Sequence, residues 1–159
     1  MTKSTLVSEV RSIAKQAVKC RACFDAGEVR AAQISLAQPR WIGQDYFDSW
    51  PRIAIVMLNP GSGDFRTDSA DAKLLNLLRE FALLGGSLRA IFAHQAEDMS
   101  RWGNGRFRAF YVDGLGLSFR TVAFANIAWC ATKGNEYPTT MLQRCFSLHT
   151  SPLLTALAP

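Results

Sequence analysis

Four cysteines are the residues of this chain best suited to chemistry. Cys20 and Cys23 form a Cys-x-x-Cys pair, and Cys130 and Cys145 follow downstream with 14 residues between them. Thiolates in this number bind either zinc or an iron–sulfur cluster. A Cys-x-x-Cys pair alone is weak evidence, because single cysteines are commonly inert core residues. Since no cysteine is left over, the set favours a metal site, with the identity of the metal left open.

Two asparagines accompany apolar runs and are candidate binding residues. Asn59 follows the run 53–58 and begins the sequence Asn59-Pro60-Gly61, while Asn126 interrupts the run 121–129. If both runs are neighbouring parallel strands, their carboxyl ends bring the two amides together, where open α/β sheets bind ligands. Buried asparagines also satisfy backbone groups in ordinary turns. The residues alone leave both interpretations open.

The sequence lacks other familiar catalytic patterns. His94 and His149 lie in helical segments without a metal-ligand or nucleophile spacing, so we interpret both as surface or helix-packing residues. No serine occupies a nucleophile elbow, and Gly61-x-Gly63 lacks the rest of a phosphate-binding loop. These observations argue against serine hydrolysis and phosphoryl transfer.

Hydrophobic patterning predicts the elements that must position these residues. The run 53–58, rich in β-branched residues, predicts a strand buried on both faces, and 121–129 predicts a second strand. An extended, partly buried connector is expected at 38–43. Apolar residues at steps of three and four predict helices, the last disturbed at Pro152, over 2–19, 70–84, 87–100, 105–113 and 139–157. Strands separated by helices indicate a parallel α/β sheet, although two strands are few for such a domain.

Composition limits the class of protein. The chain has 159 residues, of which 48% are hydrophobic and 19% charged, as expected for one soluble globular domain. No apolar run reaches the roughly 20 residues of a membrane helix, and charges spread through the N-terminal segment exclude a signal peptide. We therefore expect a cytoplasmic protein without membrane contact, in which thiols stay reduced. The net charge of +5 is compatible with a nucleic-acid partner.

Together these residues resemble the uracil-DNA glycosylase superfamily. The stretch Leu58-Asn59-Pro60-Gly61 after a hydrophobic strand is similar to the first motif of the superfamily, in the form found in its mismatch-specific branch. The stretch Asn126-Ile127-Ala128-Trp129-Cys130, followed by Gly134-Asn135-x-x-Pro138, resembles the iron–sulfur class. That class holds a [4Fe-4S] cluster through four cysteines, whose places correspond to Cys20, Cys23, Cys130 and Cys145. The resemblance covers nearly the whole chain.

The resemblance implies a three-layer α/β fold, a parallel sheet flanked by helices, for a single domain over residues 1–159. It also implies a monomer that binds DNA and hydrolyses the N-glycosidic bond of uracil or a related damaged base, after flipping the nucleotide out of the stack. Asn59 would orient the attacking water. The substrate would be bound by Pro60, Gly61, Phe65 and Asn126. The four cysteines would hold a [4Fe-4S] cluster, with zinc as the alternative.

The chain departs from the family pattern in three places. Beyond the last predicted helix the family continues with two further strands and a second, histidine-containing motif, so the chain resembles a C-terminally incomplete domain. The stretch His149-Thr150-Ser151-Pro152 looks like that motif but lies within the preceding helix. Leu58 stands where the iron–sulfur class has an acidic residue, and the uracil-stacking phenylalanine of that class falls later than Phe65. Two alternatives therefore stay open: a catalytically inactive iron–sulfur or zinc DNA-binding module, and a zinc protein unrelated to repair.

Overall fold

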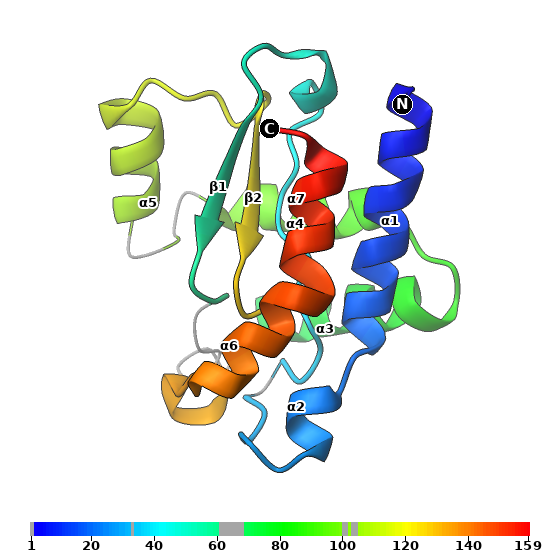
Figure 1. Ribbon diagram of the computed structural model, residues 1–159. Coiled ribbons are helices and arrows are strands. Elements are labelled where there is room, and N and C mark those ends of the chain that lie inside the picture. Colours follow the sequence, from blue (N-terminus) through cyan, green and yellow to red (C-terminus); the bar gives the residue numbers. More distant parts are fainter. Residues whose placement is uncertain (1, 33, 61–68, 100–101, 103–104) are drawn as a thin grey trace.

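A computed structural model describes residues 2–32, 34–60, 69–99, 102 and 105–159, and it combines many helices with a small sheet (Figure 1). Two strands, β1 (Ile53–Met57) and β2 (Val122–Asn126), form the sheet. The helical segments are α1 (Lys3–Lys19), α2 (Ala22–Asp25), η1 (Tyr46–Asp48), α3 (Ser69–Leu83), α4 (Leu88–Asp98), α5 (Arg106–Arg108), η4 (Ala109–Gly114), η5 (Lys133–Asn135), α6 (Thr139–Cys145), η6 (Phe146–Thr150) and α7 (Ser151–Leu157). The described chain is therefore a mixed α/β structure in which helices predominate.

The two strands β1 and β2 are parallel neighbours, as the sequence predicts. Their register places Met57, the last residue of β1, opposite Asn126, the last residue of β2. Backbone pairing continues beyond the strands, because the amides of Ile127 and Ala128 donate to the Met57 and Leu58 carbonyls at 2.8 Å. The crossover contains α3 and α4, and helices are the usual connection of a parallel pair. The residues that follow β1 consequently lie beside the carboxyl end of β2.

The connector, residues 38–43, covers the other edge of β2. The Phe124 amide donates to the Trp41 carbonyl at 2.8 Å, and the Gly43 amide donates to the Val122 carbonyl at 2.9 Å, in an antiparallel arrangement. The strand β2 therefore lies between β1 and the connector, and all five of its residues are buried. The predicted extended and partly buried connector is confirmed.

The strand β1 is less buried than its sequence predicts. Val56 within β1 is 41% exposed and Leu58 just after it is 51% exposed, while the other residues of β1 are half-buried. Among the described residues β1 pairs only with β2, so its second edge has no neighbouring strand to help cover its side chains. The prediction of a strand buried on both faces is therefore wrong for β1.

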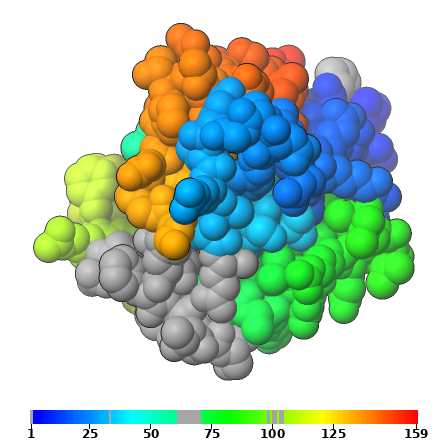
Figure 2. Space-filling model, turned by 90° about the horizontal axis from the view of Figure 1, so that it is seen from below, coloured from blue at the N-terminus to red at the C-terminus, as the bar shows by residue number. Residues whose placement is uncertain are grey.

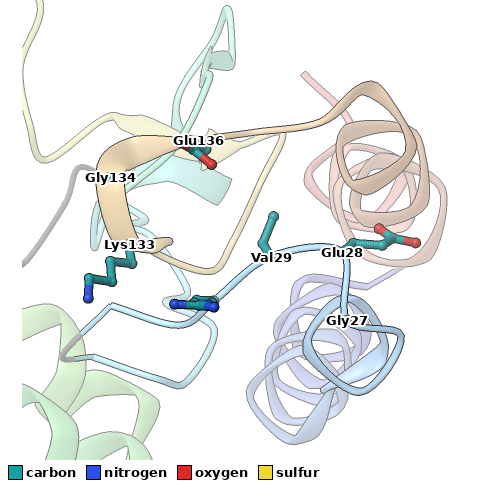
Figure 3. Close-up of a pocket in the computed structure, with 7 residues that line it drawn as sticks. Gly27, Glu28, Val29, Lys133, Gly134 and Glu136 are labelled. Carbon is teal, nitrogen blue, oxygen red and sulfur yellow. The ribbon is translucent and has the colours of Figure 1, made fainter.

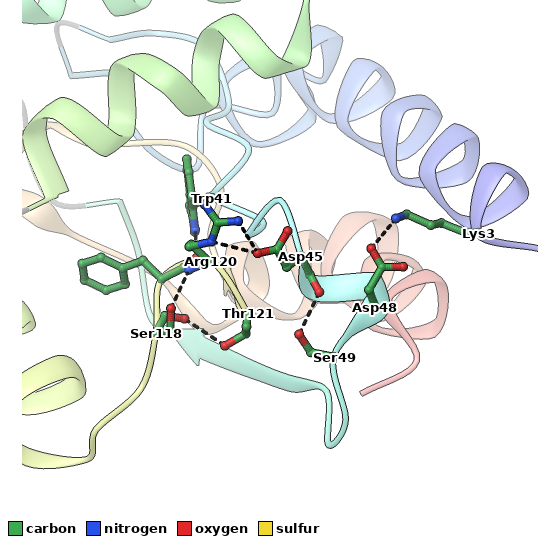
Figure 4. Close-up of polar contacts among 9 residues, drawn as sticks. Lys3, Trp41, Asp45, Asp48, Ser49, Ser118, Arg120 and Thr121 are labelled. Carbon is green, nitrogen blue, oxygen red and sulfur yellow. Dashed lines mark hydrogen bonds and ion pairs between the residues drawn. The ribbon is translucent and has the colours of Figure 1, made fainter.

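Polar contacts hold the connector at the amino end of β2 (Figure 4). The Trp41 indole nitrogen donates to the Phe119 carbonyl at 2.7 Å, and the Arg120 guanidinium pairs with Asp45 at 2.7 Å. Gly43 lies so close to this segment that a Cβ would stand 2.2 Å from the Arg120 carbonyl oxygen, so only glycine fits. These contacts fix the path of the connector along β2.

The larger helices pack through apolar faces with the predicted spacing. The helix α1 begins after Thr2, whose hydroxyl accepts a hydrogen bond from the Thr5 amide at 3.2 Å. It contacts α3 and α7, and Figure 1 shows α1 and α7 side by side. The helices predicted over 2–19, 70–84 and 87–100 are confirmed as α1, α3 and α4. No helix in the described part of the chain has the length and apolar character needed to cross a membrane.

The C-terminal helical run contains a π-helical turn. Its three segments α6, η6 and α7 follow one another without a loop, and η6 has the wider π-type turn. Pro152 lies in the first turn of α7, where its missing amide hydrogen removes one helical bond, and the wider turn precedes it. The predicted disturbance of the helix 139–157 is confirmed. The helix predicted over 105–113 is also divided, into α5 and the π-helical η4.

Candidate functional site

Four cysteines from four segments line one small cavity, which we name the cysteine cavity. Cys20 follows the last turn of α1, Cys23 lies in α2, Cys130 comes after β2, and Cys145 ends α6. Together they line this one small cavity, and all four are free thiols. Three of them are buried, and Cys20 is half-buried. The structure therefore brings together all four cysteines that the sequence predicts as ligands.

Backbone hydrogen bonds hold the loop after α1 against the segment after β2. The Ala32 amide donates to the Ala131 carbonyl at 3.1 Å, and the Gln38 amide donates to the Trp129 carbonyl at 2.8 Å. Gly27 has a φ of +70°, which allows the chain to turn back after α2. Figure 2 shows the N-terminal loop, in blue, in contact with the orange segment that follows β2. The Cys-x-x-Cys pair is thus held beside the other two cysteines.

The cavity favours neutral thiols in the metal-free protein. Burial raises the pKa of Cys130 well above its usual range and raises the pKa of Cys145 to about 11. Burial also raises the pKa of Cys23, against a hydrogen bond from Arg144, whose Nη1 lies 3.9 Å from the Cys23 sulfur. Arg144 is held by an ion pair with Glu28 at 2.6 Å. Binding of a metal would therefore displace protons from these thiols.

His149 is a buried polar residue that lines the cysteine cavity. It is 6% exposed, and its ring packs against Trp129 with the ring centroids 5.8 Å apart. Apart from a weak approach of the adjoining Leu148 backbone, neither ring nitrogen has a hydrogen-bond partner in the described part of the chain. An unpaired buried polar group costs about 1–3 kcal/mol. The cavity is thus lined by an imidazole ring that has no strong hydrogen-bond partner among the described residues.

The side chains around the cavity suit a metal cofactor. Four thiols form the ligand set of a [4Fe-4S] cluster and of a structural zinc ion. No group of three or more histidine, cysteine or acidic side chains among the described residues is close enough to hold one metal ion. A cubane cluster takes a wider arrangement, since each of its four irons binds a separate thiolate. The four thiols and the unpaired His149 ring fit such a cluster.

The second candidate site lies where β1 and β2 end, and we name it the strand-end site: Asn59, Pro60, Asn126, Asn135 and Arg40. Asn59 is half-buried, and its Nδ2 donates to the Asn135 Oδ1 at 2.6 Å. Asn135 has a φ of +57°, a left-handed conformation that asparagine tolerates better than most residues. The sequence motifs that contain Asn59 and Asn135 are therefore in direct contact.

Asn126 lies beside Pro60 and is only 1% exposed. One orientation of its amide satisfies its neighbours: Oδ1 accepts from Arg40 Nε at 3.0 Å, and Nδ2 donates to the Ala125 carbonyl at 3.2 Å. The Pro60 nitrogen is 3.1 Å from the same Oδ1 but carries no hydrogen to donate. Asn59 and Asn126 thus occupy neighbouring positions, as the sequence predicts, with Pro60 between them.

The site residues predicted from the sequence and the residues found at the two sites are not the same set. Gly61 and Phe65, both predicted to bind substrate, lie outside the described residues. Three residues contact the sites without a predicted role there: Arg40, Asn135 and His149. The spacing of four residues from Cys145 to His149, which puts both on one helical face, could have identified His149.

An open cleft lies between the loop after α2 and η5 (Figure 3). Its volume is about 480 Å³, with Glu28 on one wall and Lys133 and Glu136 on the other. The Lys133 amide donates to the Arg30 carbonyl at 2.8 Å, which ties the two walls together. Arg30 and Lys133 bring positive charge, whereas the Glu28 carboxylate already takes part in an ion pair. The cleft therefore presents the cations Arg30 and Lys133 together with the carboxylate of Glu136.

No match to this chain was found among protein-family models, curated proteins or solved structures.

The cysteine cavity and the strand-end site are adjacent along the chain, because Asn126 ends β2 and Cys130 follows shortly after it. Between them, the buried Trp129 donates through Nε1 to the Thr150 hydroxyl at 3.0 Å, and that hydroxyl donates to the Asn126 carbonyl at 2.6 Å. Buried hydrogen bonds thus connect the two sites.

Proposed function

We propose that this chain is a uracil-DNA glycosylase-like protein that hydrolyses the N-glycosidic bond of uracil or a related damaged base in DNA. It would act on DNA as a cytoplasmic monomer with a three-layer α/β fold. The observation that carries the proposal is the strand-end site, in which Asn59 and Asn126 adjoin at the ends of two parallel strands. Open α/β sheets bind ligands at this edge. The four cysteines around one cavity support the iron–sulfur form of such a protein.

Asn59 would orient the water that attacks the anomeric carbon of the sugar. Its Nδ2 is bonded to Asn135, so the carbonyl oxygen of the amide is directed away from that bond. An amide oxygen accepts a hydrogen bond from water but is too weak a base to remove the proton. The contribution of Asn59 is therefore positional, of the kind that holds a nucleophile at attacking distance.

Asn126 would bind the edge of the flipped base. The target bond is inaccessible inside a stacked duplex, so the nucleotide must leave the stack at a cost of about a few kcal/mol. An amide suits the base because it donates and accepts at the same edge. Pro60, which packs against the Asn126 amide, would form part of the wall beside the base.

A [4Fe-4S] cluster held by Cys20, Cys23, Cys130 and Cys145 would have a structural role. Bound in the cysteine cavity, it would join α1, α2, the segment after β2 and α6. The ring of His149 would donate a hydrogen bond toward it, since hydrogen bonds to the sulfurs are a usual feature of such sites. The cluster would thereby stabilise the segment that leads directly out of the strand-end site.

A single-turnover assay tests the glycosylase proposal. Cluster-loaded protein in excess is mixed with duplex DNA that carries one uracil, and the abasic product is measured over time. We expect product from the wild type and a rate lower by about 100-fold for Asn59→Ala, because a misplaced nucleophile reacts slowly. The control is Leu58→Ala, a change at an exposed neighbouring position that should keep the rate. A folded, cluster-loaded wild type that yields no product would contradict the proposal.

A non-catalytic DNA-binding module with an iron–sulfur cluster or zinc is the second candidate. The observation in its favour is the burial of Asn126, which is 1% exposed and bonded within the protein. Such a module would bind duplex DNA with an affinity that falls with salt and would release no base. The colour of anaerobically purified protein separates the two metals, since iron–sulfur clusters absorb visible light and zinc does not. A colourless sample with one equivalent of zinc would contradict the cluster assignment.

A further inference from the structure

Arg40 is a buried cation that contacts the amide of Asn126. It is 8% exposed, its Nε donates to the Asn126 Oδ1 at 3.0 Å, and its guanidinium lies over Trp102, 4.9 Å from the ring centroid. Backbone bonds from Gln38 to Trp129 and from Phe124 to Trp41 fix the connector on both sides of it. The backbone on both sides of Arg40 is therefore fixed, and its buried guanidinium contacts both Trp102 and Asn126.

We propose that Arg40 determines base specificity by fixing the Asn126 amide, so that the site accepts the imide edge of uracil and rejects the amino edge of cytosine. This inference rests on the proposed glycosylase function. A rotated amide would turn its NH₂ group toward Arg40 and its oxygen toward the Ala125 carbonyl. A buried site penalises both of these contacts, because each pairs donor with donor or acceptor with acceptor. Arg40 has donors and no acceptor, so it cannot adapt to the rotated amide.

The fixed amide presents one hydrogen-bonding pattern to a base. An asparagine side chain has two N–H donors and an oxygen with two lone pairs. Ala125 takes one donor and Arg40 takes one lone pair, which leaves one of each without a hydrogen-bond partner among the described residues. The imide edge of uracil offers a carbonyl acceptor beside an N–H donor, whereas cytosine offers the reverse. Thymine has the same edge as uracil, so Arg40 does not separate these two bases.

Pro60 packs against the Asn126 amide without a hydrogen bond to it. Its nitrogen is 3.1 Å from the Asn126 Oδ1 and has no hydrogen to donate. A base N–H that approaches this oxygen beside Pro60 would therefore form a hydrogen bond where the protein has none. A bound base would thus add a hydrogen bond to Asn126 without breaking the bonds to Arg40 and Ala125.

Two substitutions at Arg40 test the inference. Arg40→Gln introduces an amide that can donate or accept and so allows Asn126 to rotate, whereas Arg40→Lys keeps a cation that only donates. Single-turnover rates are measured on duplexes that carry one uracil or one cytosine at the same position. We expect Arg40→Gln to lower the uracil-to-cytosine rate ratio by about tenfold to hundredfold, and Arg40→Lys to keep most of it. General damage to the fold lowers both rates together, so an unchanged ratio in active Arg40→Gln overturns the inference.

A second measurement separates this inference from the proposed function. Hydrogen exchange of the Asn126 side-chain amide, followed by NMR on asparagine-labelled protein, requires no turnover. If the wild type forms no abasic product, the glycosylase proposal fails, while faster exchange in Arg40→Gln than in the wild type supports the Arg40–Asn126 contact and equal exchange overturns it. If Arg40→Gln does not fold, protected exchange of this amide in the wild type supports the inference and unprotected exchange overturns it.

Discussion

The cysteine cavity and the strand-end site adjoin each other at β2. They differ in how far the protein provides hydrogen-bond partners for their polar side chains. At the strand-end site the two asparagines are bonded to Asn135 and Arg40 within the chain. Around the cavity, burial raises the pKa of three thiols and leaves the His149 ring without a strong partner among the described residues. The strand-end site is therefore organised by the described residues themselves, whereas the proposed cluster would supply the partners that the cavity lacks.

Loss of a cysteine ligand should lower stability more than any other change. The size of this loss should depend on whether the metal or cluster is bound. We expect Cys130→Ser to abolish the visible absorbance of the loaded protein and to lower its free energy of unfolding by on the order of 5 kcal/mol, since bound metal contributes folding free energy. The metal-free protein is the control, in which the same change should cost far less. Chemical denaturation of both forms measures the difference, and equal losses would contradict the dependence of the cavity on a bound group.

Removal of the Asn126 amide should have the next largest effect and should spare the cavity. Asn126→Ala takes an acceptor from the buried Arg40 cation, and loss of such a partner costs about 2–3 kcal/mol of stability. Denaturation should show this loss with or without metal, and the visible absorbance of the loaded protein should not change. Asn59→Ala, at a half-buried position, is the matched control, with an expected cost of about 1 kcal/mol. Equal stability losses at the two asparagines would contradict the extra cost expected when the buried Arg40 cation loses its acceptor.

Replacement of His149 should change stability in opposite directions in the two forms of the protein. His149→Phe exchanges an unpaired buried ring for an apolar one of similar size, so the metal-free protein should gain about 1–2 kcal/mol. The loaded protein should lose its cluster sooner, because the donor toward the cluster is gone. Denaturation measures the first effect, and the decay of visible absorbance with a chelator measures the second. A cluster that persists as long as in the wild type would show that His149 does not contact the bound group.

The smallest effect is expected at the cleft, in DNA affinity alone. Lys133 is exposed there, and loss of one phosphate contact should lower the slope of log affinity against log salt by about 1 in Lys133→Ala. Arg89→Ala removes an exposed charge from α4 and serves as the control. Anisotropy titrations of a labelled duplex at several salt concentrations provide the measurement. Equal slopes for the two variants would exclude the cleft from the DNA interface.

The sequence predicts those elements of the fold that depend on residues close together in the chain. The helices α1, α3 and α4 follow from apolar periodicity, and the parallel pairing of the strands follows from the helices between them. The burial of β1 could not be predicted in the same way. The composition of the run 53–58 does not reveal whether another strand covers its second edge. That depends on segments distant in the sequence.

Long-range contacts explain what the sequence does not reveal at the two sites. Arg40 lies on a connector without periodicity, and only the antiparallel pairing with β2 brings it to Asn126. His149 looks like any helix-packing histidine until the four cysteines are placed around one cavity. Gly61 and Phe65 stay predictions, because both lie outside the described residues.

The connector also sets the direction in which the sheet can grow. On one side of β2, the backbone groups of Val122 and Phe124 are bonded to Gly43 and Trp41, so no further strand can pair there. On the other side, within the described residues, β1 is the outermost strand and carries the exposed side chain of Val56. An additional strand that pairs directly with β1 or β2 would therefore add next to β1 and extend the sheet away from the connector.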